Sequence, residues 1–291
     1  ADAAKLCESS GSEMAETWGE PSMQALAARF DEIDTPHARD VLARLRARFG
    51  GFSQEWASAR DQACADTRIR GVASEDSLEQ RMYCFERHRQ EFQILLTAIT
   101  KESGPDDFVA MIEAVNDLPR SSDCRDVNRP EFRVPLPASD ADRERVQDID
   151  DKLVELTPTH WTKMNTADIA EVALLISEAK PLGYAPLLAR AFVVQHELYR
   201  LHENDAAALA AARAGIVAAT EAKNNEGIAR WMLYFLSRKT LEDAPLEEFD
   251  TTRFFVGNAV QRAGNTPELR ARFAMAQARH SSIRTQEEVQ E

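Results

Sequence analysis

Glycine is scarce in this sequence, with 11 in 291 residues, and the alternating apolar and polar runs typical of β-strands are nearly absent. The chain contains no stretch of about 18 apolar residues, so we expect no segment of it to span a membrane. It also contains no G-x-S-x-G, no H-E-x-x-H and no glycine-rich phosphate loop. These absences argue against a β-rich fold, an integral membrane fold and the motif-bearing enzyme classes.

An excess of basic side chains is missing too. The chain carries 35 Lys and Arg against 49 Asp and Glu, a formal net charge of -14. Nucleic-acid binding requires a basic face against the phosphate backbone, and adhesion to anionic lipid requires the same. We therefore expect neither partner, and we interpret the acidic surface mainly as a source of solubility.

Helical periodicity is the positive signal. Ala, Leu, Arg and Glu are abundant, and apolar residues recur at spacings of three and four, which predicts an all-α fold. Gly50-Gly51 should kink or break one long helix. The helices expected in the first part cover residues 3–18, 22–33, 37–67, 77–101 and 107–118.

Prolines mark the expected domain boundary. Between Pro119 and Ser139 the chain has four prolines and no helical period, which is typical of a linker. We therefore predict a helical domain over residues 1–120, a linker over 121–139 and a second domain over 140–291.

The second domain is predicted to be a helical repeat. Its helices are expected in pairs with a period close to 40 residues, because Leu188-Ala189-Arg190 recurs as Ile228-Ala229-Arg230 and Leu269 occupies the same position in the next unit. Pairs that cannot bury their own apolar faces must stack on one another. This predicts a tetratricopeptide-like array, without the usual 34-residue signature, that continues beyond residue 291. The expected helices cover 141–156, 166–180, 186–202, 205–223, 226–241 and 246–263, with another beginning at 266–268.

All four cysteines, Cys7, Cys64, Cys84 and Cys124, lie in the first 124 residues. If the first helix packs antiparallel to the helix that ends near residue 67, Cys7 meets Cys64, and the same argument for the next hairpin brings Cys84 to Cys124. This is one of the three connectivities that four cysteines allow. Four reduced, buried cysteines are the alternative. Spacings of 57, 20 and 40 with no C-x-x-C disfavour zinc. Disulfides would indicate an oxidising compartment.

The remaining polar residues predict no catalytic group, metal or cofactor. The six histidines are scattered, and His196 and His202 are too far apart to share a helix face as metal ligands. The adjacent carboxylates Asp150-Asp151 are interpreted as solvated surface residues. Trp231 falls on an apolar stripe with Ile228 and Phe235, which predicts a core position.

The cysteine-bearing helices carry a family resemblance. The pattern W-x-x-x-R-x-x-A-C-x-x-T-x-x-R-G-x-x-S, followed by R-x-x-C, resembles the region after the membrane segment in large bacterial Ser/Thr protein kinases of the myxobacterial type. After the glycine, Val72-Ala73 replaces the pair of an acidic residue and glutamine that is more usual in that family. The residues that match are Trp56, Arg60, Ala63, Cys64, Thr67, Arg70, Gly71, Ser74, Arg81 and Cys84.

The resemblance implies a non-catalytic, extracytoplasmic (periplasmic) sensor region, tethered by a membrane helix outside this chain. We expect it to bind a protein or peptide on the concave face of the array, and a homodimer is a further expectation. The alternatives are a free-standing periplasmic scaffold and an enzyme whose site forms only on folding. The candidate partner-binding residues, on the first helix of each pair, are Arg190, Gln195, Glu197, Arg230 and Tyr234.

Overall fold

The computed structural model describes residues 7, 10–33, 35–102, 104–125, 134–157, 166–239 and 246–290. Every regular element in these ranges is helical, which confirms the prediction of an all-α fold. The chain divides into two compact units, residues 1–182 and 183–291, which are considered separately below. None of the helices in the described ranges has the length and apolar character needed to cross a bilayer.

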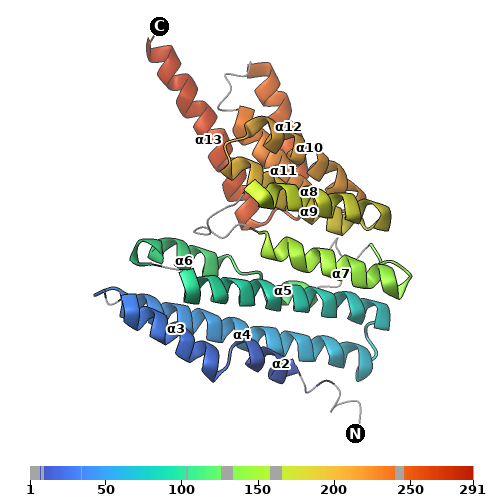
Figure 1. Ribbon diagram of the computed structural model, residues 1–291. Helices are drawn as coiled ribbons and strands as arrows, with labels where there is room; N and C mark the ends of the chain where they lie inside the picture. Colours follow the sequence, from blue (N-terminus) through green and yellow to red (C-terminus); the bar gives the residue numbers. More distant parts are fainter. Residues whose placement is uncertain are drawn as a thin grey trace. The chain divides into compact units, whose positions relative to one another are not determined.

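The first unit is built around two long helices, α4 and α5, which lie side by side (Figure 1). Helices α2, α3 and α6 pack against α4, and α7 packs against α5. The elements are α2 (Ser10–Thr17), α3 (Glu20–Ile33), α4 (Ala38–Arg68), α5 (Glu75–Glu102), α6 (Phe108–Asn116), α7 (Asp140–Glu155) and α8 (Thr166–Ala179), with short 3₁₀ turns η1 (Pro105–Asp107), η2 (Ser121–Arg125) and η4 (Lys180–Leu182).

An aromatic cluster forms the centre of this unit. The ring centroid of Phe92 on α5 lies 5.0 Å from the ring centroid of Phe49 and 5.0 Å from that of Phe52, both on α4. The ring centroids of Trp18 and Phe49 are 5.2 Å apart. Helix α4 runs through Gly50-Gly51 without the break that the sequence allowed. Two interior glycines cost about 1 kcal/mol each relative to alanine, and the buried phenylalanines on either side offset that cost.

Two disulfides fasten the unit. Cys7 is bonded to Cys64 on α4, and Cys84 on α5 is bonded to Cys124 on η2. The connectivity predicted from hairpin packing is thereby confirmed. The bonds are separated by 57 and 40 residues in sequence, and closing loops of that length stabilises the fold by about 4 kcal/mol each on the chain-entropy model.

Helix α7 belongs with the cysteine-bearing helices. The Tyr83 hydroxyl on α5 donates a hydrogen bond to Asp150 on α7, and Arg143 on α7 pairs with Glu79 on α5 at 3.3 Å. The division between compact units therefore follows residue 182 rather than the predicted linker at 121–139. Asp150 is 2% exposed, so its interpretation as a solvated residue was wrong.

Five helices form the described part of the second unit. Each packs against the next, and α11 also contacts α13 (Figure 1). Their starts agree with the predicted ones to within two residues. The assignment of these helices to a tetratricopeptide-like array stays a prediction. The helices are α9 (Ala185–Leu201), α10 (Asp205–Glu221), α11 (Asn225–Lys239), α12 (Leu246–Arg262) and α13 (Pro267–Gln290).

The turns between helices in this unit share one backbone conformation at the end of the preceding helix. Glu203 (φ 56°), Lys223 (φ 54°) and Gly264 (φ 85°) adopt the left-handed conformation that ends a helix. Asn204 and Asn224 follow the first two, and each side chain accepts a hydrogen bond from a backbone amide of the next helix.

The acidic excess of the whole chain lies in residues 1–182, because acidic and basic side chains are nearly balanced in residues 183–291.

Candidate functional site

The second unit contains a pocket of about 670 Å³ between three alternate helices. That volume falls in the range of small-ligand and side-chain binding pockets. Its lining residues in the described part of the chain come from α9, α11 and α13, and we call the site the α9–α11–α13 pocket. It is lined by Val193, His196, Glu197, Gly227, Arg230, Trp231, Leu233, Tyr234, Ser237, Arg272, Met275 and Ala276.

Three aromatic rings form one wall of the pocket. His196 meets Trp231 at 5.1 Å and Tyr234 at 4.5 Å, and both contacts are edge-to-face. The Nδ1–H of His196 donates to the backbone oxygen of Ala208 at 3.0 Å, which anchors the buried ring to α10. Nε2 is the other ring nitrogen of His196, and it does not take part in this bond to the α10 backbone.

Trp231 lies against a glycine. A Cβ added at Gly215 on α10 would come within 2.7 Å of Cε2 and Cζ2 of the indole, a distance that real Cβ atoms do not reach. The missing side chain lets the indole lie directly on the α10 backbone, so Gly215 fixes the position of the tryptophan that lines the pocket.

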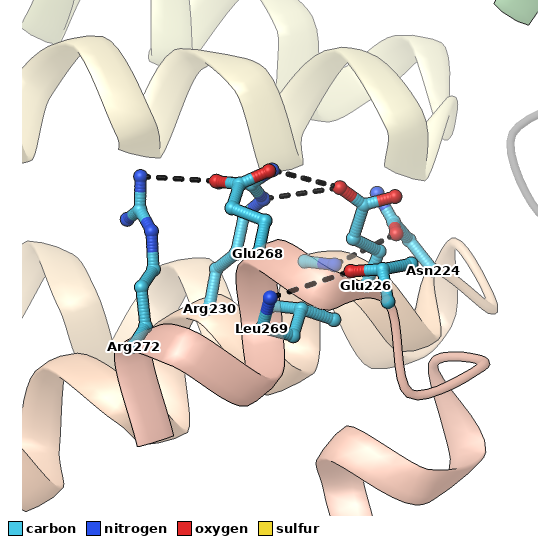
Figure 2. Close-up of polar contacts among 8 residues, drawn as sticks. Asn224, Glu226, Arg230, Glu268, Leu269 and Arg272 are labelled. Carbon is cyan, nitrogen blue, oxygen red and sulfur yellow. Dashed lines mark hydrogen bonds and ion pairs between the residues drawn. The ribbon is translucent and has the colours of Figure 1, made fainter. Parts of the chain in front are cut away.

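The polar rim is a chain of ion pairs between α11 and α13 (Figure 2). Arg230 donates to Glu226 at 2.9 and 3.1 Å and to Glu268 at 2.9 and 3.1 Å, and Arg272 pairs with Glu268 at 3.1 Å. Burial lowers the pKa of Arg230, but its hydrogen bonds to Glu268 and Glu226 outweigh that effect, and the pKa is raised above its ordinary value.

Side-chain caps fix the beginnings of both rim helices (Figure 2). Oδ1 of Asn224 accepts from the Gly227 amide at 2.8 Å at the start of α11, and Oγ1 of Thr266 accepts from the Leu269 amide at 3.3 Å at the start of α13. Each cap is expected to stabilise its helix by about 1 kcal/mol. The ion pairs of the rim therefore connect two helix ends that are already ordered locally.

This arrangement has the elements of a recognition surface. An aromatic wall and apolar side chains form the pocket, and the charges at its rim are paired with one another. Interfaces that bind protein segments combine an apolar centre with a polar rim in the same way. Glu197 approaches His196 Nε2 only to 3.9 Å, which is longer than a hydrogen bond.

The structure places three of the five predicted partner-binding residues in the pocket. Glu197, Arg230 and Tyr234 line it, whereas Arg190 and Gln195 lie on α9 but are not lining residues. The lining residues on α9 lie between 193 and 197, in the second half of that helix, whereas Arg190 lies in its first half. A partner-binding role for all five stays a prediction.

Other lining residues were not among the predicted binding residues. His196 was set aside as a scattered histidine. The predicted core position of Trp231 is confirmed, because this side chain is 7% exposed and belongs to a hydrophobic cluster, and its ring lines the pocket as well. Arg272 and Met275 lie on α13, whose inner face was not assigned. The available signal was the shared helical spacing, because 193, 196 and 197 on α9 repeat the steps of three and four seen at 227, 230, 231 and 234 on α11.

The first unit holds one further group of potential ligands. Among the described residues, Cys84, His88 and Cys124 are the three metal-ligating side chains whose donor atoms come together, and all three are buried. The two sulfurs are bonded to each other in this structure. The prediction of no metal stays a prediction.

Comparison of the chain with protein-family models, with curated proteins and with solved structures yields no match.

Proposed function

We propose that this chain is a non-catalytic, extracytoplasmic protein-binding region, and that the α9–α11–α13 pocket receives a side chain or short segment of a partner protein. The observation that carries the proposal is the pocket itself. Three successive alternate helices place an aromatic wall, exposed apolar side chains and a paired polar rim around one cavity.

Exposed apolar groups support a protein partner. Val193 is 46% exposed and Met275 is 57% exposed, and both line the pocket. Met adapts its shape to different apolar partners, and Tyr, Trp and Arg are the residue types that contribute most to binding energy at protein interfaces. Tyr234, Trp231 and Arg230 supply those three types side by side on α11.

The disulfides support an extracytoplasmic location. Both bonds involve buried cysteines of a stable helical core, and such bonds persist in oxidising compartments. The resemblance of the segment around Cys64 and Cys84 adds the proposal that the chain is the sensor part of a Ser/Thr kinase receptor. Partner binding would then change how receptor molecules associate, and so change kinase activity across the membrane.

A free-standing periplasmic scaffold is the second candidate. The observation in its favour is that the described residues lining the pocket all lie within residues 183–291. The two candidates share the pocket and differ in what is attached to the chain. Sequencing the coding region around residue 1 distinguishes them, because only the receptor requires a kinase domain and a membrane helix.

Site-specific photocrosslinking tests the binding role. A photoreactive amino acid at position 275 in the pocket is compared with one at position 217 on α10, where Val217 is 57% exposed but does not line the pocket. We expect one discrete adduct from position 275 in the native envelope, none from position 217, and loss of the adduct when Tyr234→Ala is added. Equal labelling from both positions would rule out the pocket as the binding site.

A further inference from the structure

The Cys84–Cys124 disulfide has a histidine packed against it. His88 lies one helical turn after Cys84 on α5, in the arrangement C-x-x-x-H that places two side chains on one helix face. Nε2 of His88 lies 3.8 Å from Sγ of Cys84 and 3.7 Å from Sγ of Cys124, and Nδ1 lies 3.4 Å from Sγ of Cys124. The three side chains are 0–3% exposed, so the cluster is buried.

The nitrogen is already placed as a tetrahedral zinc site requires. Bonds of about 2.3 Å to sulfur and about 2.0 Å to nitrogen at a tetrahedral angle put sulfur and nitrogen about 3.5 Å apart. The two observed separations of 3.7 and 3.8 Å are close to that value. Only the two sulfurs must move apart, and they can do so once the bond between them is broken.

We propose that reduction of the Cys84–Cys124 disulfide creates a zinc site whose ligands are Cys84, Cys124 and His88. A dithiol reductant supplies two electrons and two protons and is itself oxidised to a disulfide, which leaves two cysteine thiols. Zn²⁺ then displaces both thiol protons and binds two thiolates and the neutral imidazole, with water in the fourth position.

Charge and softness favour this metal. Two thiolates neutralise the charge of a divalent ion, so the buried complex carries no net charge, and burial of an unpaired ion is avoided. Thiolate and imidazole together select zinc over magnesium or calcium, which require oxygen ligands. Among the described residues, no histidine groups with the second disulfide, Cys7–Cys64, in this way, so that bond is the internal control.

Cobalt titration tests the site directly. The full chain carrying Cys7→Ser and Cys64→Ser, which leaves one cysteine pair, is reduced under anaerobic conditions, freed of reductant and titrated with Co²⁺ as a visible probe for zinc. We expect one equivalent of Co²⁺ to give the intense visible bands of a tetrahedral sulfur-ligated ion. The bands should disappear when Zn²⁺ is added, and the oxidised protein should give none.

Substitution of His88 distinguishes a metal site with three protein ligands from metal binding by the two cysteine thiols alone. His88→Phe keeps an aromatic ring and both cysteines, and we expect it to weaken metal affinity at least about tenfold. Far-ultraviolet circular dichroism and the melting temperature are followed alongside, and zinc should raise the melting temperature of the reduced protein. The proposal is overturned if the reduced, folded protein shows no tetrahedral spectrum, if His88→Phe binds equally well, or if reduction unfolds the chain and zinc does not restore it.

Discussion

Arg230 on α11 donates one hydrogen bond to each carboxylate oxygen of Glu268 on α13, at 2.9 and 3.1 Å. This two-pronged pair connects residues that are 38 positions apart in sequence, and it lies at the rim of the α9–α11–α13 pocket. Its side chains are 39% and 52% exposed, so solvent screening limits its contribution to stability. We therefore propose that its role is to orient the guanidinium that a partner would meet.

Replacing the acidic member should affect binding more than stability. Glu268→Gln removes the charge that holds Arg230 across the helices, and we expect the free energy of unfolding to fall by less than about 1 kcal/mol. Partner affinity should fall severalfold, because Arg230 loses its charged partner on α13 and keeps only Glu226 on its own helix. Asp250→Asn breaks the Asp250–Arg253 pair outside the pocket and is the matched control. Thermal unfolding and binding titration measure the two effects, and an equal loss of affinity in the control would contradict this account.

Adding a methyl group at Gly215 should disturb Trp231. The new Cβ would lie 2.7 Å from the indole, so the ring or helix α10 must shift, and overpacking of this kind costs about 1–3 kcal/mol. Gly51→Ala is the matched control, because a Cβ there meets nothing within 4 Å and the residue is inside a helix. We expect the control to be stabilised by about 0.5–1 kcal/mol. Chemical denaturation with tryptophan fluorescence checks both, and a neutral Gly215→Ala would show that the indole has room.

Removing one disulfide should destabilise the first unit strongly. Cys7→Ser with Cys64→Ser reopens a loop closed by residues 57 apart, and we expect a loss of about 4 kcal/mol in the free energy of unfolding. Calorimetry of the double variant beside the wild type measures it. A melting temperature unchanged by the double substitution would show that the core of α4 and α5 is sufficient without this bond.

Asp151 gives the first unit a defined pH dependence. Burial raises the pKa of Asp151, the charges of Asp150, Glu86 and Asp148 raise it further, and a hydrogen bond from Gln90 opposes them. The folded state therefore holds the proton more tightly than the unfolded state. Stability that is present in acid is lost as pH rises from about 4 through the raised pKa.

Asp151→Asn should remove that loss. We expect the variant to match the wild type near pH 3 and to be more stable than it at pH 7, with the difference developing between those values. Asp148→Asn, at an exposed position of the same helix, should show a smaller difference in the same direction. Urea denaturation at a series of pH values measures the effect, and a constant difference across the series would contradict the assignment.

Local signals explain what the sequence predicted well. Helix starts depend on nearby residues such as Ser139, which caps α7, and Asn204, which caps α10, so the pattern located these two starts to within one residue. The cysteine pairing followed from antiparallel packing of helices that are near one another in the chain. The first inference needs only residues close in sequence, and the second needs only elements separated by at most one other α-helix.

Long-range contacts explain what the sequence did not reveal. Tyr83 and Asp150 are 67 positions apart, and their hydrogen bond, which no periodicity encodes, draws α7 into the first unit. His196 and Trp231 acquire their place in the pocket only when α9 and α11 pack against α10. His88 had a local signal, the C-x-x-x-H spacing from Cys84, but Cys124 reaches it only through the fold.

The most direct test of the central claim is a calorimetric titration of the partner identified by crosslinking into the full chain and into two variants. Tyr234→Ala alters the aromatic wall of the pocket, and Val217→Ala alters an exposed position on α10 outside it. The account predicts that Tyr234→Ala weakens affinity by about thirtyfold, the effect of losing about 2 kcal/mol at an interface hot spot, while Val217→Ala leaves affinity unchanged. Equal affinity for the wild type and Tyr234→Ala would contradict the claim that this pocket receives the partner.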